Sequence, residues 1–264
     1  MRVLICLILL STFCACTLEP IFIDPDSLGD YYIYARLSNT YDEQPVYIEK
    51  TIPENQSRYV PDAKVWISYD STIIRFIYFQ DGYYRENGPG KLKVIPGMKY
   101  DLHAQFSDGH SLTATTVVPD IPEILYPVQG DTVIQDFTKR KVQDSTLAPI
   151  RWKQSRNALR YKIILIPKDG FLWSLVGSYQ GTSGVIPHLR LTSSAEKNNT
   201  YETDLYLFAI NGIDFDLNNG HNSDEKGDDW ISDLNNPNIT GGIGYFISMS
   251  CQKQQLFIKR KPVQ

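Results

Sequence analysis

The sequence has few cysteines and no large excess of charge of either sign. Only 4 of its 264 residues are cysteine, and 26 lysines and arginines stand against 30 aspartates and glutamates, which gives a formal net charge of -4. A strongly basic chain would indicate a polyanion partner and a strongly acidic one a disordered tail, so neither is predicted. We therefore expect no nucleic-acid partner.

Motifs that carry catalysis are also missing. The stretch GTSG at 181–184 lacks the Gly-x-Ser-x-Gly spacing of a hydrolase elbow, and the sequence has no glycine-rich motif that would cradle a phosphate. A pair of glycosidase carboxylates is defined by its separation in space, so the sequence leaves a hidden hydrolase open as an alternative. We expect a protein without catalytic activity.

The only long hydrophobic run lies at the N-terminus. Arg2 precedes apolar residues 3–13, which are too few to span a membrane but match the core of a signal peptide. The run ends in FCAC and resembles a bacterial lipobox, in which a cysteine after a small residue is lipidated. We therefore predict a signal peptide over 1–15, lipidation at Cys16, a tether over 16–30 and an exported, lipid-anchored protein. The alternative is ordinary cleavage at the same place without a lipid.

Removal of the signal peptide leaves no disulfide framework. Cys6 and Cys14 leave with the signal peptide and Cys16 carries the lipid, so Cys251 is the one cysteine left. Cys251 continues the apolar alternation of FISMS, which predicts a small buried hydrophobic side chain rather than a nucleophile.

The mature sequence predicts β-structure throughout. Its 42% hydrophobic and 12% aromatic content, with 17 tyrosines, is typical of half-buried strands. Short alternating runs place the first set of strands at 31–37, 45–50, 63–69, 72–79, 91–95, 99–106 and 111–118. Between the last two, Asp108-Gly109 predicts a two-residue hairpin turn, in which His103 opposes Ala114.

Prolines at 119, 122 and 127 predict a break between two domains, one over 31–121 and the other over 122–264. A second set of strands is expected at 148–153, 160–166, 171–179, 204–210, 244–250 and 255–260, with a long acidic loop over 211–242. Trp152 and Tyr161 lie where immunoglobulin and fibronectin type III sandwiches place core aromatics. We therefore expect an all-β chain of two immunoglobulin-like or transthyretin-like sandwiches in tandem.

Five stretches resemble one family. AKVWISY (63–69), GYYR (82–85), PGMKYDL (96–102), SDGHSLTATTVVP (107–119) and NNPNITGGIGYF (235–246) are similar to segments of an uncharacterised family of Bacteroidota outer-membrane lipoproteins, the domain of unknown function DUF4249. The resemblance implies a carboxypeptidase-regulatory-like first domain and a fibronectin type III-like second domain. It also implies an outer-membrane or cell-surface location and association with TonB-dependent uptake barrels, and it carries over no catalytic residues.

Exposed aromatic residues mark the predicted contact surface. Alternation along 63–69 places Trp66 among polar neighbours, where its large rigid ring can stack on a sugar or anchor a protein partner. The alternative is that the tether or the second domain covers Trp66. Tyr83 and Tyr84, beside Arg85 in a predicted turn, form a second candidate contact.

The stretch DFDLNNGHNSDE at 214–225 is a candidate metal site. Side-chain oxygens at positions one, three, five, nine and twelve follow the order of a calcium loop, and they belong to Asp214, Asp216, Asn218, Asn222 and Glu225. The sixth position is Asn219 rather than glycine and no helix is predicted beside it, so an EF-hand is not expected. The stretch either binds Ca²⁺ or is a solvated acidic loop, for which Asn, Asp and Gly are also typical.

Composition, signal peptide and resemblance lead to one hypothesis and one rival. The hypothesis is a lipid-anchored, non-catalytic accessory protein that binds a TonB-dependent outer-membrane barrel or its cargo. The rival is a carbohydrate-binding or adhesion module of the cell surface, which would use Trp66 as a stacking platform.

Overall fold

The computed structural model describes residues 31–51, 58–88, 91–135, 149–168, 172–173, 176–185, 190–191, 200–212 and 238–260. Every regular element in these residues is a β-strand and none is a helix, which confirms the all-β prediction. The strands are β1 (Tyr31–Ser38), β2 (Val46–Lys50), β3 (Lys64–Tyr69), β4 (Thr72–Gln80), β5 (Tyr83–Glu86), β6 (Lys99–Gln105), β7 (Ser111–Val117), β8 (Glu123–Tyr126), β9 (Thr132–Gln135), β10 (Pro149–Lys153), β11 (Arg160–Pro167), β12 (Leu172–Trp173), β13 (Val176–Tyr179), β14 (Ser183–Val185), β15 (Arg190–Leu191), β16 (Thr200–Asn211), β17 (Ile239–Thr240) and β18 (Ile243–Arg260).

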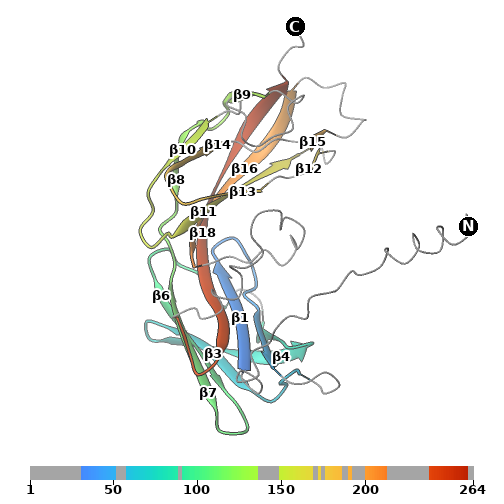
Figure 1. Cartoon of the computed structure of the whole chain (residues 1–264), viewed down its shortest axis with the longest axis vertical. Helices are drawn as coiled ribbons and strands as arrows, with labels where there is room; N and C mark the ends of the chain where they lie inside the picture. The colour runs from blue at the N-terminus through green and yellow to red at the C-terminus, as the bar shows by residue number, and fades with distance from the viewer. Residues whose placement is uncertain are drawn as a thin grey trace, which may run out of the picture.

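One large mixed sheet dominates the molecule (Figure 1). Its strands follow the order β13-β11-β16-β18-β1-β2-β5-β4-β3-β6-β7-β17, and β9 also pairs with β18. The sheet curls, so that a buried hydrogen bond of 2.8 Å joins the hydroxyls of Thr116 and Ser248 and brings the end of β7 back to β18. Smaller sheets of β14-β10-β8 and β12-β15 complete the described fold.

The described residues form three hydrophobic cores. The smallest packs Phe208 and Ile210 of β16 against Tyr245, Ile247, Met249 and Cys251 of β18. The two larger cores lie inside the curled framework. The first fills the curl of β1 to β7, where alternate residues point inward; its largest fully buried members include Tyr84, Tyr100 and Phe246. The second lies between β8, β10, β11, β16 and the end of β18, around Trp152 and Tyr161. Trp152 is 2% exposed and Tyr161 is fully buried, so both are core aromatics as predicted.

The long strand β18 belongs to both halves of the molecule (Figure 1). Its first part pairs in parallel with β1, and its end pairs in parallel with β9, while β16 pairs along its other edge. The sequence predicted two separate strands here, at 244–250 and 255–260, but the structure has one continuous strand. The division into domains over 31–121 and 122–264 stays a prediction. The shared strand β18 connects the two predicted domains.

The inner face of β18 changes character along its length. It begins with Phe246 in the first core and ends with Leu256 and Ile258 in the second. Between these apolar ends lie four polar side chains, which are Ser248, Ser250, Gln252 and Gln254. A polar row between two apolar cores needs hydrogen-bond partners, because burying an unpaired polar group is costly.

These partners are backbone groups of the proline-rich segment that joins the two halves. The bonds run from Ser248 Oγ to Val117 O (3.0 Å), from Ser250 Oγ to Asp120 O (2.8 Å), from the Ile124 N–H to Gln252 Oε1 (3.1 Å) and from Gln254 Nε2 to Pro127 O (2.6 Å). Proline has no N–H to contribute to a strand ladder, so the side chains of β18 take the place of a paired strand. The segment is therefore fixed along β18.

The glycines of the stretch 235–246 permit close contact between strands. A Cβ at Gly244, where φ is +124°, would overlap the carbonyl oxygen of Ile33 and lie 2.9 Å from its carbonyl carbon. A Cβ at Gly242 would lie 2.6 Å from the carbonyl oxygen of Tyr31. The glycines thus allow the start of β18 to pass directly beside β1. This part of the resembling sequence has a structural role.

Two local predictions were wrong. Residues 91–95 do not form a strand, because side chains satisfy their backbone: Glu86 Oε2 accepts the Leu92 N–H at 2.7 Å, and the Tyr100 hydroxyl donates to the Lys93 carbonyl at 2.6 Å. The hairpin between β6 and β7 is closed by Phe106 and His110 through a three-residue loop, so His103 pairs with Thr113 and not with Ala114.

The second set of strands differs from the prediction in another place besides β18. The expected strand over 171–179 is two short strands, β12 and β13, which lie in different sheets. Conversely, β5 was expected to be a turn, and it is a strand that pairs with β2 and β4.

Candidate functional site

The outer side of β3 and β4 is unusually apolar for a surface that faces solvent. Along β4, Phe76 is buried in the first core, while Ile73, Ile77 and Phe79 point the other way and are 61%, 53% and 50% exposed. A strand with one solvated face normally alternates apolar and polar residues, whereas β4 is apolar on both faces. We call the outward set the β3–β4 face, and it consists of Lys64, Trp66, Ile73, Arg75, Ile77 and Phe79.

The strand register determines how these residues are arranged. In the antiparallel pair of β3 and β4, Trp66 lies opposite Arg75 and Ser68 lies opposite Ile73. Residues directly opposite each other on one face are close enough for their side chains to interact. The apolar side chains of β4 thus flank the tryptophan and form one continuous surface with it.

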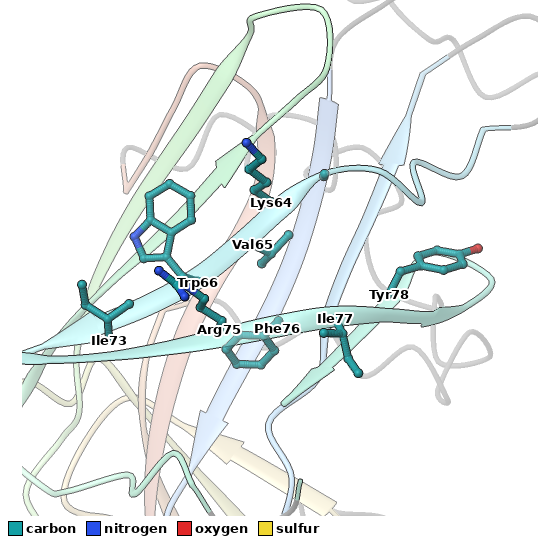
Figure 2. Close-up of a pocket in the computed structure, with 9 residues that line it drawn as sticks. Lys64, Val65, Trp66, Ile73, Arg75, Phe76, Ile77 and Tyr78 are labelled. Carbon is teal, nitrogen blue, oxygen red and sulfur yellow. The ribbon is translucent and has the colours of Figure 1, made fainter. Parts of the chain in front are cut away.

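A groove of about 690 Å³ lies along this surface. Its lining includes Lys64, Trp66, Ile73, Arg75 and Ile77. Figure 2 shows Trp66 and Lys64 projecting from β3, with Arg75 reaching from β4 toward the base of the indole. The volume is within the range of pockets that accept a small ligand or a protruding segment of a partner.

Trp66 is half-buried, and a neighbouring strand holds its ring in place. The His103 ring on β6 stacks against the indole with 5.0 Å between ring centroids and 10° between the planes. His103 Nε2 lies 3.4 Å from the Ser68 hydroxyl on the same outer face. One side of the indole is therefore occupied, and Trp66 still lines the groove.

The groove carries positive charge only. Lys64 and Arg75 are both exposed, and neither forms an ion pair within the described part of the chain. None of the nine residues that line the groove is acidic. Arg85 is already engaged, since its guanidinium lies 3.9 Å from the Phe79 ring centroid and 3.8 Å from a Glu43 carboxylate oxygen. An approaching acidic group would therefore meet two cations that form no ion pair with any described residue.

The two tyrosines predicted as a second contact lie on opposite sides of β5. Tyr83 is 43% exposed and its ring lies 5.0 Å from that of Tyr47. Tyr84 is fully buried, and its hydroxyl donates to the Val60 carbonyl, so the predicted role of Tyr84 in partner contact is wrong. The reason is the two-residue period of a strand, which turns neighbouring side chains to opposite faces. Burial raises the pKa of Tyr84 to about 12.

The predicted lipid site and calcium site belong to parts of the chain that the structure does not describe. Cys16 and the candidate calcium ligands Asp214, Asp216, Asn218, Asn222 and Glu225 lie outside the described residues. Among the residues that the structure does describe, no group of three or more His, Cys, Asp or Glu side chains is arranged to hold a metal ion. No helix long and apolar enough to cross a membrane is found in that same part of the chain.

Sequence reasoning found Trp66 but missed its apolar neighbours. Ile73, Ile77 and Phe79 were placed in a strand, and their outward direction was not considered. The signal was present in TIIRFIYF, where apolar residues occupy both alternating sets. By contrast, Cys251 is buried as predicted, and burial raises the pKa of its thiol to about 12.

Comparison with known proteins gives a family and a distant structural likeness. The family described as a domain of unknown function (DUF4249) matches residues 19–255. No curated protein matches the chain. Similar solved structures include human mucin-like protocadherin EC1-2, at 14% identity and a TM-score of 0.25, covering 88% of this chain and 99% of that chain. Another contains fibronectin(III)-like modules of Clostridium thermocellum CbhA, at 10% identity and a TM-score of 0.25, covering 88% of this chain and 98% of that chain.

Proposed function

Because the chain belongs to the DUF4249 family, whose description assigns no activity, we propose its function from the site: a non-catalytic, lipid-anchored binding protein of the cell envelope. Its partner is a TonB-dependent outer-membrane barrel or the cargo of that barrel. A lipid at Cys16 would confine the protein to a membrane surface and raise its effective concentration near such a partner.

The observation that supports binding is the apolar β3–β4 face. Ile73, Ile77 and Phe79 are each at least half exposed and lie on one strand beside the groove of Trp66. Exposed apolar residues that form a continuous patch with polar or charged neighbours are typical of interaction sites. A half-buried tryptophan that is fixed by a stacked neighbour loses little conformational entropy when a partner covers it.

A carbohydrate-binding or adhesion module is the second candidate. Trp66 favours it, because an aromatic ring at a groove can stack on a sugar ring. The aliphatic side chains of Ile73 and Ile77 favour a protein partner instead, since they offer a sugar no hydrogen bond. A hydrolase is the third candidate.

Affinity purification from native membranes tests the proposal. The full-length protein, solubilised in mild detergent, should retain an outer-membrane barrel in near-stoichiometric amount. The variant Ile77→Ser should retain much less, whereas Ile134→Ser should retain as much as the wild type, because Ile134 is similarly exposed (58%) but lies on β9. If no barrel is retained, the migration of the protein is compared in gels that contain different glycans. Retardation that is lost in the variant Trp66→Ala would replace the proposal with the carbohydrate-binding alternative.

A further inference from the structure

The chemistry of the β3–β4 face restricts what can cover it. Two of its three most exposed apolar side chains are isoleucines, which gain free energy by packing against other apolar groups and form no hydrogen bonds. The groove is concave, with Trp66 half-buried in its lining. A flat lipid surface contacts side chains that protrude, whereas a groove receives a segment that protrudes from a partner. This geometry favours a protein.

Charge disfavours a second copy of the chain as the occupant. In a twofold-symmetric dimer the same surface lies on both sides of the interface, so Lys64 and Arg75 of both copies would gather in it. Like charges brought together in an interface are destabilising, and no acidic residue lines the groove to offset them. The complementary surface is therefore acidic as well as apolar.

The register places the part of the face around Lys64 and Ile77 at the end of the sheet where β1 begins. Tyr31 opens β1, and its hydroxyl donates to Asp108 in the loop between β6 and β7 at 2.6 Å. At the same end, Lys64 opens β3 opposite Gln105, the last residue of β6. The second half of β4 runs toward this end too, since Phe76 lies opposite Val65 and Ile77 follows it.

The distance to a lipid anchor is then limited by chain length. The segment from Cys16 to Tyr31 spans at most about 50 Å even when fully extended. With a lipid at Cys16, Tyr31 lies no farther than this from the membrane surface. A surface segment of an integral membrane protein is therefore within reach of the β3–β4 face.

We propose that the β3–β4 face docks an acidic, apolar segment that an integral membrane protein presents just outside the bilayer. This inference rests on the proposed binding function and adds the chemistry and location of the partner surface. Lys64 and Arg75 pair with carboxylates of the segment, and Ile73, Ile77 and Phe79 pack against its apolar side chains.

Site-specific photocrosslinking in native membranes tests the inference. A photoreactive residue replaces Ile77 in the full-length protein, and crosslinked peptides are mapped by mass spectrometry. We expect one integral membrane protein, crosslinked through an acidic segment outside the bilayer. Adding Lys64→Glu and Arg75→Glu should reduce the product about tenfold or more, because charge reversal turns two attractions into repulsions. The control Lys153→Glu with Lys259→Glu makes the same change in charge on other strands and should leave the product unchanged.

Each other outcome overturns the inference. Crosslinks to lipid alone, to a second copy or to a soluble protein would show a different occupant, and a product that survives charge reversal would show that the charges do not select the partner. Thermal melts establish that the variants fold. If the double variant with Lys64→Glu and Arg75→Glu does not fold, the single variant Arg75→Gln replaces it. If a barrel copurifies but Ile77 does not crosslink to it, only this inference fails; if no membrane protein is found by either method, the proposed function fails with it.

Discussion

Replacing Gly244 by alanine should destabilise the protein more than any surface substitution. At Gly244 the backbone has φ of +124°, a conformation that costs a residue with a side chain about 1–3 kcal/mol. The new Cβ would also overlap the Ile33 carbonyl oxygen, which belongs to the neighbouring strand β1. Backbone cannot rotate aside as a flexible side chain can, so β1 and β18 must separate locally.

The magnitude follows from these two effects together. Separating the strands around Gly244 sacrifices ladder hydrogen bonds worth about 1 kcal/mol each, in addition to the conformational cost. We expect a loss of about 4 kcal/mol or more in the free energy of unfolding, which places the substitution among the most damaging single changes. Phe246 lies two residues further along β18 in the first core, so the disturbance reaches packed side chains.

Gly130→Ala is the matched control. Gly130 also has a positive φ, +84°, but a Cβ there would meet nothing within 4 Å. Its cost should be only the conformational preference, about 1–2 kcal/mol. Urea unfolding followed by circular dichroism measures both variants, and Gly244→Ala should have the lower midpoint by roughly 0.5 M or more. Equal midpoints would refute the claim that close strand contact, rather than φ alone, requires glycine at 244.

The other predictions concern the face, the joining segment and ionisation. Trp66→Ala should weaken partner retention and change the free energy of unfolding by no more than about 1 kcal/mol. Tyr84→Ala should lower the free energy of unfolding by about 3–5 kcal/mol, because Tyr84 is fully buried. Pull-downs measure the first effect and thermal melts the second. Ser250→Ala and Gln254→Leu should each lower the free energy of unfolding by about 1–3 kcal/mol, because each leaves a backbone carbonyl of the proline-rich segment without its donor. Hydrogen exchange in the proline-rich segment should become faster. Unchanged exchange would contradict the hydrogen bonds described. The free energy of unfolding should fall as pH rises from about 9 toward 12. Burial raises the pKa of Cys251 from 9.0 and that of Tyr84 from 10.0, each to about 12, so the folded state keeps protons that the unfolded chain releases. A free energy of unfolding that does not change across this pH range would show that neither shift is real.

Local alternation was enough to predict most strands of the fold. The segments around β1, β3, β6 and β7 were placed within a residue or two, and the faces of β3 were assigned correctly, because burial follows the two-residue period of a strand. Prediction failed where side chains from outside a segment take its backbone hydrogen bonds. The segment 91–95 alternates like a strand, but the carboxylate of Glu86 and the hydroxyl of Tyr100 take its backbone hydrogen bonds.

The continuity of β18 was hidden by its own chemistry. Gln252 and Gln254 interrupt the apolar pattern, and two strands, 244–250 and 255–260, were predicted on either side of them. They are instead inward-facing side chains that hold the proline-rich segment, and only the three-dimensional arrangement supplies their partners. The same limit applies to the candidate site: the sequence identified Trp66, but it could not show that Arg75 and the exposed row of β4 lie beside it.

The structure also separates two kinds of signal that looked alike in the sequence. The glycines of NNPNITGGIGYF allow strands to approach, and the serines and glutamines of β18 bind the segment between the halves, so both motifs explain how the chain folds. Neither role requires Ile73, Ile77 and Phe79 to be apolar, because polar residues on the outer face would leave the first core intact. These apolar side chains are not needed for folding, and they lie beside two cations that form no ion pair within the described ranges. Both features are best explained by a surface that another molecule covers.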